Sequence, residues 1–216
     1  MAWAGLAAVL GGLLAIVLTP PFAIAYFAAY PGFDVPPFWI APLRPLLAPW
    51  LTFASPKTVY NAYGRVYELV YLLFLPAVFG VHRLHRGTTS RTEYLGFAMV
   101  VVGLIASFVG VAGDYWADGA GFVIEMLGLL ILSIGTAVYG VGLLRSGIIP
   151  RWCAWLLVSS LPGIFVMFPL IGHIPSGPTL PIAIAWLMIG SVLLVNKRRR
   201  PQQPGPAPVR SSMDRG

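Results

Sequence analysis

Six long apolar stretches occupy most of this 216-residue chain. As a helix, about 20 apolar residues cross a hydrocarbon core of about 30 Å. The stretches approach that length and lie near residues 4–29, 60–81, 94–113, 120–144, 152–171 and 179–195. They are continuously apolar and do not alternate with polar residues, which excludes a transmembrane β-barrel. The sequence therefore predicts an all-α, polytopic membrane bundle of six transmembrane helices.

Charged residues are scarce. They make up 10% of the sequence, against about 25% in soluble domains, and 58% of the residues are hydrophobic. A soluble fold could not bury this much apolar surface, so we expect the lipid bilayer to be the main partner. The net charge of +7 does not indicate nucleic-acid binding, because most basic residues lie at the ends of the stretches and in the tail. Cys153 is the single cysteine, which excludes an intrachain disulfide and a thiol-based metal cluster, and we expect no cofactor.

The connections between the stretches alternate between basic and non-basic. Those after the second and fourth stretches, and the segment after the sixth, carry Arg83, Arg86, Arg91, Arg145, Arg151 and the basic run 197–200. The other connections have no such bias, and Asp114 and Asp118 follow the third stretch. Lys and Arg gather on the cytoplasmic side of membrane proteins. We therefore expect both termini in the cytoplasm (N-in/C-in) and a multi-pass protein of the inner, cytoplasmic membrane.

Two segments lie outside the predicted spans. Residues 31–59 contain too many prolines for one continuous helix and too many aromatic and apolar side chains for a free loop. We expect them to lie at the outer membrane interface, with a re-entrant hairpin as the alternative. Residues 1–196 would then form one transmembrane domain. Residues 197–216 are predicted to be a disordered cytoplasmic tail, whose basic start would attract anionic lipids.

Glycine recurs every seven residues in the third and fourth stretches. The two repeats are Gly96, Gly103 and Gly110, followed by Gly121, Gly128, Gly135 and Gly142. A seven-residue repeat keeps one stripe facing a partner helix, and small residues let helix backbones approach closely in lipid. The connection between the two stretches is short, so we expect antiparallel neighbours whose glycine stripes face each other.

Two local patterns predict features of individual helices. The sequence Ser90-Arg91-Thr92-Glu93 is typical of a capping box, with Ser90 as the N-cap of the third span, and it explains Glu93 structurally. The run Thr-Pro-Pro at 19–21 predicts a kink or break in the first span, because proline clashes with the preceding turn.

The carboxylates inside the stretches are the candidates for chemistry, because an ionisable group in a span is costly unless it is paired or wetted. The two carboxylates are Glu68 and Glu125. The predicted orientation puts both near the outer ends of their spans, with Glu68 roughly 9 Å inward from the end of the second span. We expect an outward-facing polar pocket, which residues 31–59 could roof. In the alternative, Arg65 and Glu68 form a local ion pair and Glu125 bonds a neighbouring helix. The candidate substrate-binding residues are Asn61, Arg65, Tyr67, Glu68, Glu125 and His173.

Three classes of function are compatible with these features. The leading hypothesis is transport of a small solute, or its proton-coupled movement, through the outward-facing pocket. The alternative is a non-catalytic scaffold or regulatory protein that associates with a second copy or with another membrane protein. A lipid-modifying enzyme is the third hypothesis, although no phosphate loop, nucleophile elbow or metalloprotease motif occurs. His82 and His85 lie among arginines without the carboxylates or cysteines of a metal site, so we expect no metal and no catalytic residue.

Two segments carry a resemblance to known proteins. They are Gly113-Asp114-Tyr115-Trp116, with the glycine-rich stretch after it, and the turn from Arg145 to Trp152, which reads Arg-Ser-Gly-Ile-Ile-Pro-Arg-Trp. Over roughly residues 94–195 the chain resembles small bacterial six-helix integral membrane proteins of uncharacterised function. The resemblance implies a helical membrane topology and no active residues.

Overall fold

The computed structural model describes residues 2–32, 34–84, 90–117, 119–147 and 149–199. Within these ranges the chain is helical without strands, and six helices are long and apolar enough to cross a membrane. The predicted all-α fold and the number of helices able to span a membrane are therefore confirmed. The long helices are α1 (Ala2–Ala29), α4 (Pro56–Arg83), α5 (Arg91–Trp116), α6 (Phe122–Ser146), α7 (Arg151–Ile171) and α8 (Ser176–Arg199).

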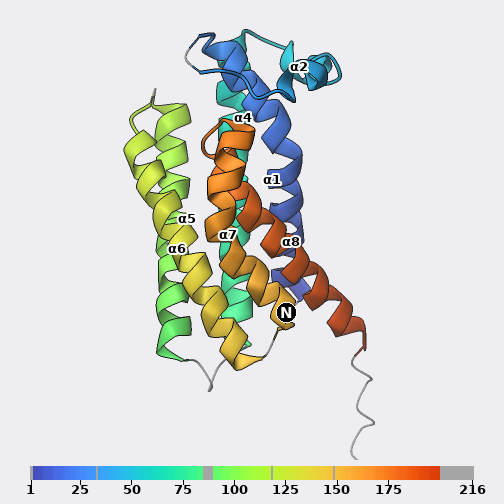
Figure 1. The fold of residues 1–216 in the computed structure, drawn as a ribbon, viewed down its shortest axis with the longest axis vertical. Helices are drawn as coiled ribbons and strands as arrows, with labels where there is room; N and C mark the ends of the chain where they lie inside the picture. The colour runs from blue at the N-terminus through green and yellow to red at the C-terminus, as the bar shows by residue number, and fades with distance from the viewer. Residues whose placement is uncertain (1, 33, 85–89, 118, 148, 200–216) are drawn as a thin grey trace, which may run out of the picture.

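The six long helices pack in a ring that follows the chain order (Figure 1). Each packs mainly on its two neighbours in the chain, α8 closes the ring against α1, and few contacts cross the middle. Bulky buried side chains fill the interior, among them Tyr67, Phe74, Leu104, Leu132 and Trp186. Large apolar side chains remain exposed on the outer faces, as expected for helices that contact lipid.

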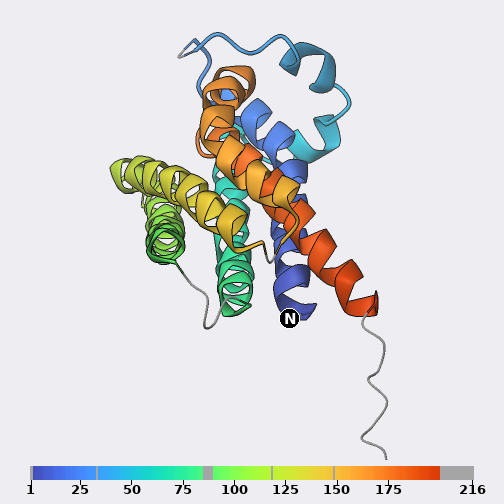
Figure 2. The ribbon, with the colours of Figure 1, turned by 60° about the horizontal axis from the view of Figure 1, so that its bottom comes forward.

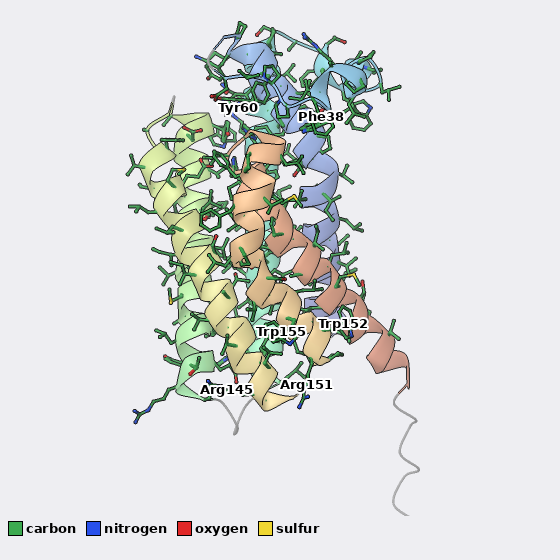
Figure 3. All side chains as sticks on the ribbon, in the orientation of Figure 1. Phe38, Tyr60, Arg145, Arg151, Trp152 and Trp155 are labelled. Atoms are coloured by element: carbon green, nitrogen blue, oxygen red, sulfur yellow. The ribbon has the colours of Figure 1, made fainter. Side chains whose placement is uncertain are left out.

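Successive long helices run in opposite directions, so alternate connections meet at the same end. Figure 3 shows Arg145 and Arg151 at one end of the bundle and Tyr60 at the other. The N-terminus lies at the arginine end (Figure 1). This arrangement collects the described basic connections at a single end. His85 and Arg86, from the connection after α4, and residues 200–216 lie outside the described residues.

The glycine stripes of α5 and α6 face the partner helix, as predicted. A Cβ added to Gly103 would meet the backbone of Leu132, and one added to Gly110 would meet the backbone of Glu125. A Cβ on Gly142 would lie 2.6 Å from the Cα of Glu93. The two backbones are therefore in contact along most of their length, which only glycine permits.

Replacing one of these glycines tests the packing. We expect Gly103→Leu to lower the free energy of unfolding by about 1–3 kcal/mol, because the added side chain forces α5 away from Leu132. The midpoint of thermal unfolding in detergent measures the change. Val102→Leu is the matched control, since Val102 precedes Gly103 and its side chain is 54% exposed. Equal midpoints for the two variants would contradict the close contact.

The N-terminus of α5 has the predicted cap. The Glu93 N–H donates to Ser90 Oγ at 3.2 Å. The Glu93 side chain also has a role that the capping motif did not predict. It is buried at the arginine end of the bundle, where Oε1 lies 3.7 Å from His82 Nδ1. His82 in turn stacks on Phe97, with ring centroids 3.9 Å apart.

The sequence predicts a kink or a break at residues 19–21. There is no break, because α1 is helical from Ala2 to Ala29 through Pro20 and Pro21, and the kink stays a prediction. Membrane helices tolerate proline where neighbouring side chains and helices accommodate the freed carbonyls. The Thr19 hydroxyl donates to the carbonyl of Ala15 at 2.7 Å, within this part of the helix.

Two short helices, α2 (Ile40–Leu43) and α3 (Ala48–Leu51), occupy the proline-rich connection. They lie beside the end of α1, outside the ring of long helices (Figures 1 and 2). The indole N–H of Trp39 donates to the carbonyl of Leu170 at 2.7 Å, and the Tyr63 hydroxyl donates to the carbonyl of Trp50 at 2.9 Å. These bonds hold the segment to α7 and α4. The predicted location of residues 31–59 at the outer membrane interface stays a prediction.

Candidate functional site

A pocket of about 460 Å³ opens at the end of the bundle opposite Arg145 and Arg151. This volume lies within the usual range of about 300–1,000 Å³ for small-molecule sites. The Tyr and Phe residues that line it are Tyr26, Tyr30, Tyr60, Tyr115, Phe122 and Phe168. The polar side chains that line it are Asp34, Lys57, Asn61, Asp114 and His173.

Tyr60 on α4 is the centre of the aromatic wall. Its ring centroid lies 5.2 Å from that of Tyr115, 5.5 Å from Tyr30 and 5.7 Å from Tyr26. The Tyr30 and Tyr115 rings stand edge-on to it, at interplanar angles of 90° and 69°. Edge-to-face contacts at these distances are favourable, so each ring is held by its neighbours. The wall is therefore built by three helices together.

A chain of hydrogen bonds runs behind this wall. The Tyr60 hydroxyl is 2.9 Å from the Tyr115 hydroxyl and 3.3 Å from His173 Nε2. His173 Nδ1 shares a hydrogen bond of 2.9 Å with Ser176 Oγ at the start of α8. The connection after α7 is able to place His173 here because Gly172 takes a left-handed φ of +69° at the end of the helix.

The polar groups continue into the bundle below the pocket. Thr179 lies one turn beyond Ser176, and its Oγ1 is 3.1 Å from the Tyr71 hydroxyl. Tyr67 is also fully buried here, with its ring 6.0 Å from that of Tyr71. The interior near the pocket is therefore unusually polar for a membrane bundle.

His173 is a neutral member of this site. Its side chain is 2% exposed, and burial lowers the pKa of the imidazole from 6.5 to about 3. At neutral pH the ring therefore carries no charge, and its two nitrogens serve as one donor and one acceptor.

This burial predicts a loss of stability in acid. Between pH 6.5 and about 3 the unfolded chain binds a proton at His173 that the folded protein does not bind. The free energy of unfolding should therefore fall as the pH is lowered through this window, by up to about 1.4 kcal/mol per pH unit. Unfolding midpoints measured across the range in detergent should decline less steeply for His173→Gln than for the wild type. An identical slope in both proteins would show that His173 is not the titrating group.

Glu125 lies behind the pocket, in the first turns of α6. Its side chain is 1% exposed, and neither carboxylate oxygen has a hydrogen-bond partner among the described residues. Gly110 of α5 packs against its backbone. The carboxylate is close enough to interact electrostatically with Asp114 and Tyr115. The positive end of the α6 dipole is the favourable partner that the fold itself supplies.

The predicted site residues occupy three different places. Asn61 and His173 line the pocket, and Tyr67 and Glu125 are buried beside or beneath it. Arg65 and Glu68 lie on the outer surface of α4, around the side chain of Trp116.

Trp116 explains the position of Arg65 and Glu68. The guanidinium carbon of Arg65 lies 4.1 Å from the centre of the Trp116 ring, and Arg65 Nε donates to the carbonyl of Tyr115 at 3.1 Å. The Trp116 indole N–H donates to Glu68 Oε1 at 2.7 Å. These contacts tie the side of α4 to the end of α5. Glu68 does not line the pocket that Glu125 backs.

Sequence reasoning did not include several pocket residues among the candidates. Tyr26, Tyr30 and Asp34 come from the end of α1 and the connection after it, and Tyr115 comes from the last turn of α5. A tyrosine near a span end is common at membrane interfaces, so its type alone gives no reason to assign it to a site. Asp118, which follows α5 together with Asp114, lies outside the described residues.

Comparison of the chain with protein-family models, with curated proteins and with solved structures gave no match. The structure therefore assigns the protein to a class but not to a family. The class is that of multi-pass α-helical membrane proteins, here with a pocket lined by aromatic and acidic residues at one end. Among the described residues, no group of three or more His, Cys, Asp or Glu side chains is placed to hold a metal ion.

Proposed function

We propose that the protein is a proton-coupled carrier of a small solute in the cytoplasmic membrane. In this proposal both termini are cytoplasmic and the pocket faces outward. The distribution of the described arginines at the helix ends and connections supports this orientation, because Arg83, Arg91, Arg145 and Arg151 belong to the end opposite the pocket, whereas Arg44 is at the pocket end.

Glu125 is the observation that carries the proposal. A charged carboxylate without a cation or a hydrogen-bond donor is costly inside a membrane protein, and binding a proton removes that charge. Tyr115 lines the pocket and is close enough to Glu125 to interact with it electrostatically. A solute that enters the pocket therefore changes the surroundings of Glu125, which couples solute binding to the uptake or release of a proton.

The packing below the pocket favours a carrier over an open channel. Phe74, Leu104 and Leu132 fill the ring on the arginine side of the polar region, and all three are fully buried. A solute in the pocket is therefore blocked from the other end. Passage requires the long helices to rearrange around the site, as carriers do.

Proteoliposomes that contain the pH-sensitive dye pyranine test this function. Choline, lysine, alanine, acetate and glucose would be added outside in turn, with protein-free vesicles as the control. We expect at least one of these solutes to cause a protein-dependent change in internal pH. The proposal would be contradicted if none of the five caused such a change.

A further inference from the structure

We infer that the pocket selects an organic cation with an ammonium group, an inference that rests on the proposed role of the pocket as the solute site. The composition and geometry of the lining support this choice over an anion or a neutral solute. Two independent features carry it, namely the cluster of tyrosine rings and the balance of charge.

Four tyrosine rings form one cluster at the pocket. Tyr26, Tyr30 and Tyr60 lie within 5.5–5.7 Å of one another, and Tyr115 adds a fourth ring at 5.2 Å from Tyr60. All four line the same pocket. A cation within about 6 Å of a tyrosine centroid is attracted by the electron-rich face of the ring, so a pocket lined by four tyrosines favours an ammonium group.

The charges in the lining leave an unbalanced carboxylate. Asp34 and Lys57 are both exposed at the rim, and their charges offset each other. The Tyr26 hydroxyl already donates to Asp34 Oδ2 at 3.1 Å. Asp114 is less exposed, and its carboxylate has no hydrogen bond or ion pair with any described residue. Asp114 is therefore free to attract a cation in the pocket.

The groups around Asp114 do not compete with such a ligand. His173, which also lines the pocket, is neutral because of its burial. Glu125 lies behind the wall and adds negative potential when it is ionised. Among the described residues that line the pocket, Asp34 and Asp114 are acidic and only Lys57 is a Lys or Arg, so like-charge repulsion disfavours an anion.

Choline and its uncharged isostere 3,3-dimethylbutan-1-ol separate charge from shape. Isothermal titration of each compound into the purified protein in detergent gives the two affinities. We expect choline to bind at least about tenfold more tightly than the isostere, because contacts with several rings and with Asp114 depend on its charge. Equal affinities, tighter binding of the isostere, or binding of neither compound would overturn the inference.

Substitutions that remove a negative or a positive charge from the pocket provide the second test. Asp114→Asn should weaken choline binding about tenfold and leave the isostere unaffected, whereas Lys57→Gln should tighten choline binding about twofold. Lys57 is exposed, so its substitution does not threaten folding. Arg145→Gln, at the far end, makes the same change of charge as Lys57→Gln and should have no effect. Changes in the reverse directions would indicate an anion site and overturn the inference.

The inference and the proposed function fail in different ways. If the isostere binds as well as choline and some solute of the panel still moves protons, cation selectivity is wrong and the carrier stands. If choline binds with the expected preference but no solute of the panel changes the internal pH, the cation site stands and the carrier is wrong.

Discussion

Glu125→Gln should abolish solute-dependent proton movement in proteoliposomes, whereas Glu68→Gln should leave it unchanged. Glutamine has nearly the shape of glutamate but cannot bind and release a proton. Glu125 is buried and has no hydrogen-bond partner among the described residues, so the substitution removes only its titration. We expect the rate of the internal pH change to fall at least about tenfold, to the level of protein-free vesicles.

The Glu68 variant is the matched control, because it shows whether the effect depends on where the carboxylate lies in the fold. Glu68 accepts a hydrogen bond from Trp116 on the outside of α4, away from the pocket. The same substitution at both positions therefore changes the same chemical group in two different environments. Thermal midpoints near the wild-type value would show that both variants fold. Proton movement that survives in Glu125→Gln, or is lost equally in both variants, would contradict the role given to Glu125.

Gly64→Val should weaken choline binding and lower the thermal midpoint. Gly64 on α4 packs directly against the ring of Tyr115, and a Cβ at this position would overlap the ring carbons. Tyr115 must then move, which breaks its hydrogen bond to Tyr60 and opens the aromatic wall. Overpacking of this kind costs about 1–3 kcal/mol, and we expect choline to bind more than about tenfold more weakly.

Ala62→Val is the matched control for this variant. Ala62 lies on the same part of α4, is only partly buried and does not line the pocket. Titration with choline and thermal unfolding of both variants check the prediction. If Gly64→Val binds choline as tightly as Ala62→Val does, the close contact with Tyr115 is not what shapes the pocket.

The sequence was sufficient to predict the features that depend on repetition along the chain. Long apolar runs identify the spans because lipid allows few alternatives to a helix. The heptad spacing of glycines such as Gly103 and Gly128 predicts the α5–α6 contact, because the spacing fixes which side of each helix carries them. Ser90 predicts the start of α5 from local chemistry alone.

The rotation of each helix about its axis was harder to predict. Tyr67 and Glu68 are neighbours in the chain, yet Tyr67 is fully buried in the core and Glu68 lies on the outer side beside Trp116. Depth in the membrane, which the apolar run gives, is nearly the same for both. The indole of Trp116 decides the position of Glu68, and it comes from a different helix.

The pocket combines residues that are distant in the sequence. Tyr26, Asp34, Tyr60, Tyr115 and His173 come from different helices or connections and meet only at the end of the ring. Single-sequence patterns report neighbours along a helix, and they contain no information on which helix ends converge. The ring order of the six helices supplies that information.

Labelling of Asn61→Cys in intact cells tests most directly whether the pocket opens to the outside. Asn61 lines the pocket, whereas the natural Cys153 is fully buried near the arginine end, so wild-type protein serves as the unlabelled control. A membrane-impermeant maleimide applied outside should modify Asn61→Cys without permeabilisation. Labelling that occurs only after the cells are permeabilised would place the pocket on the cytoplasmic side and contradict an outward-facing solute site.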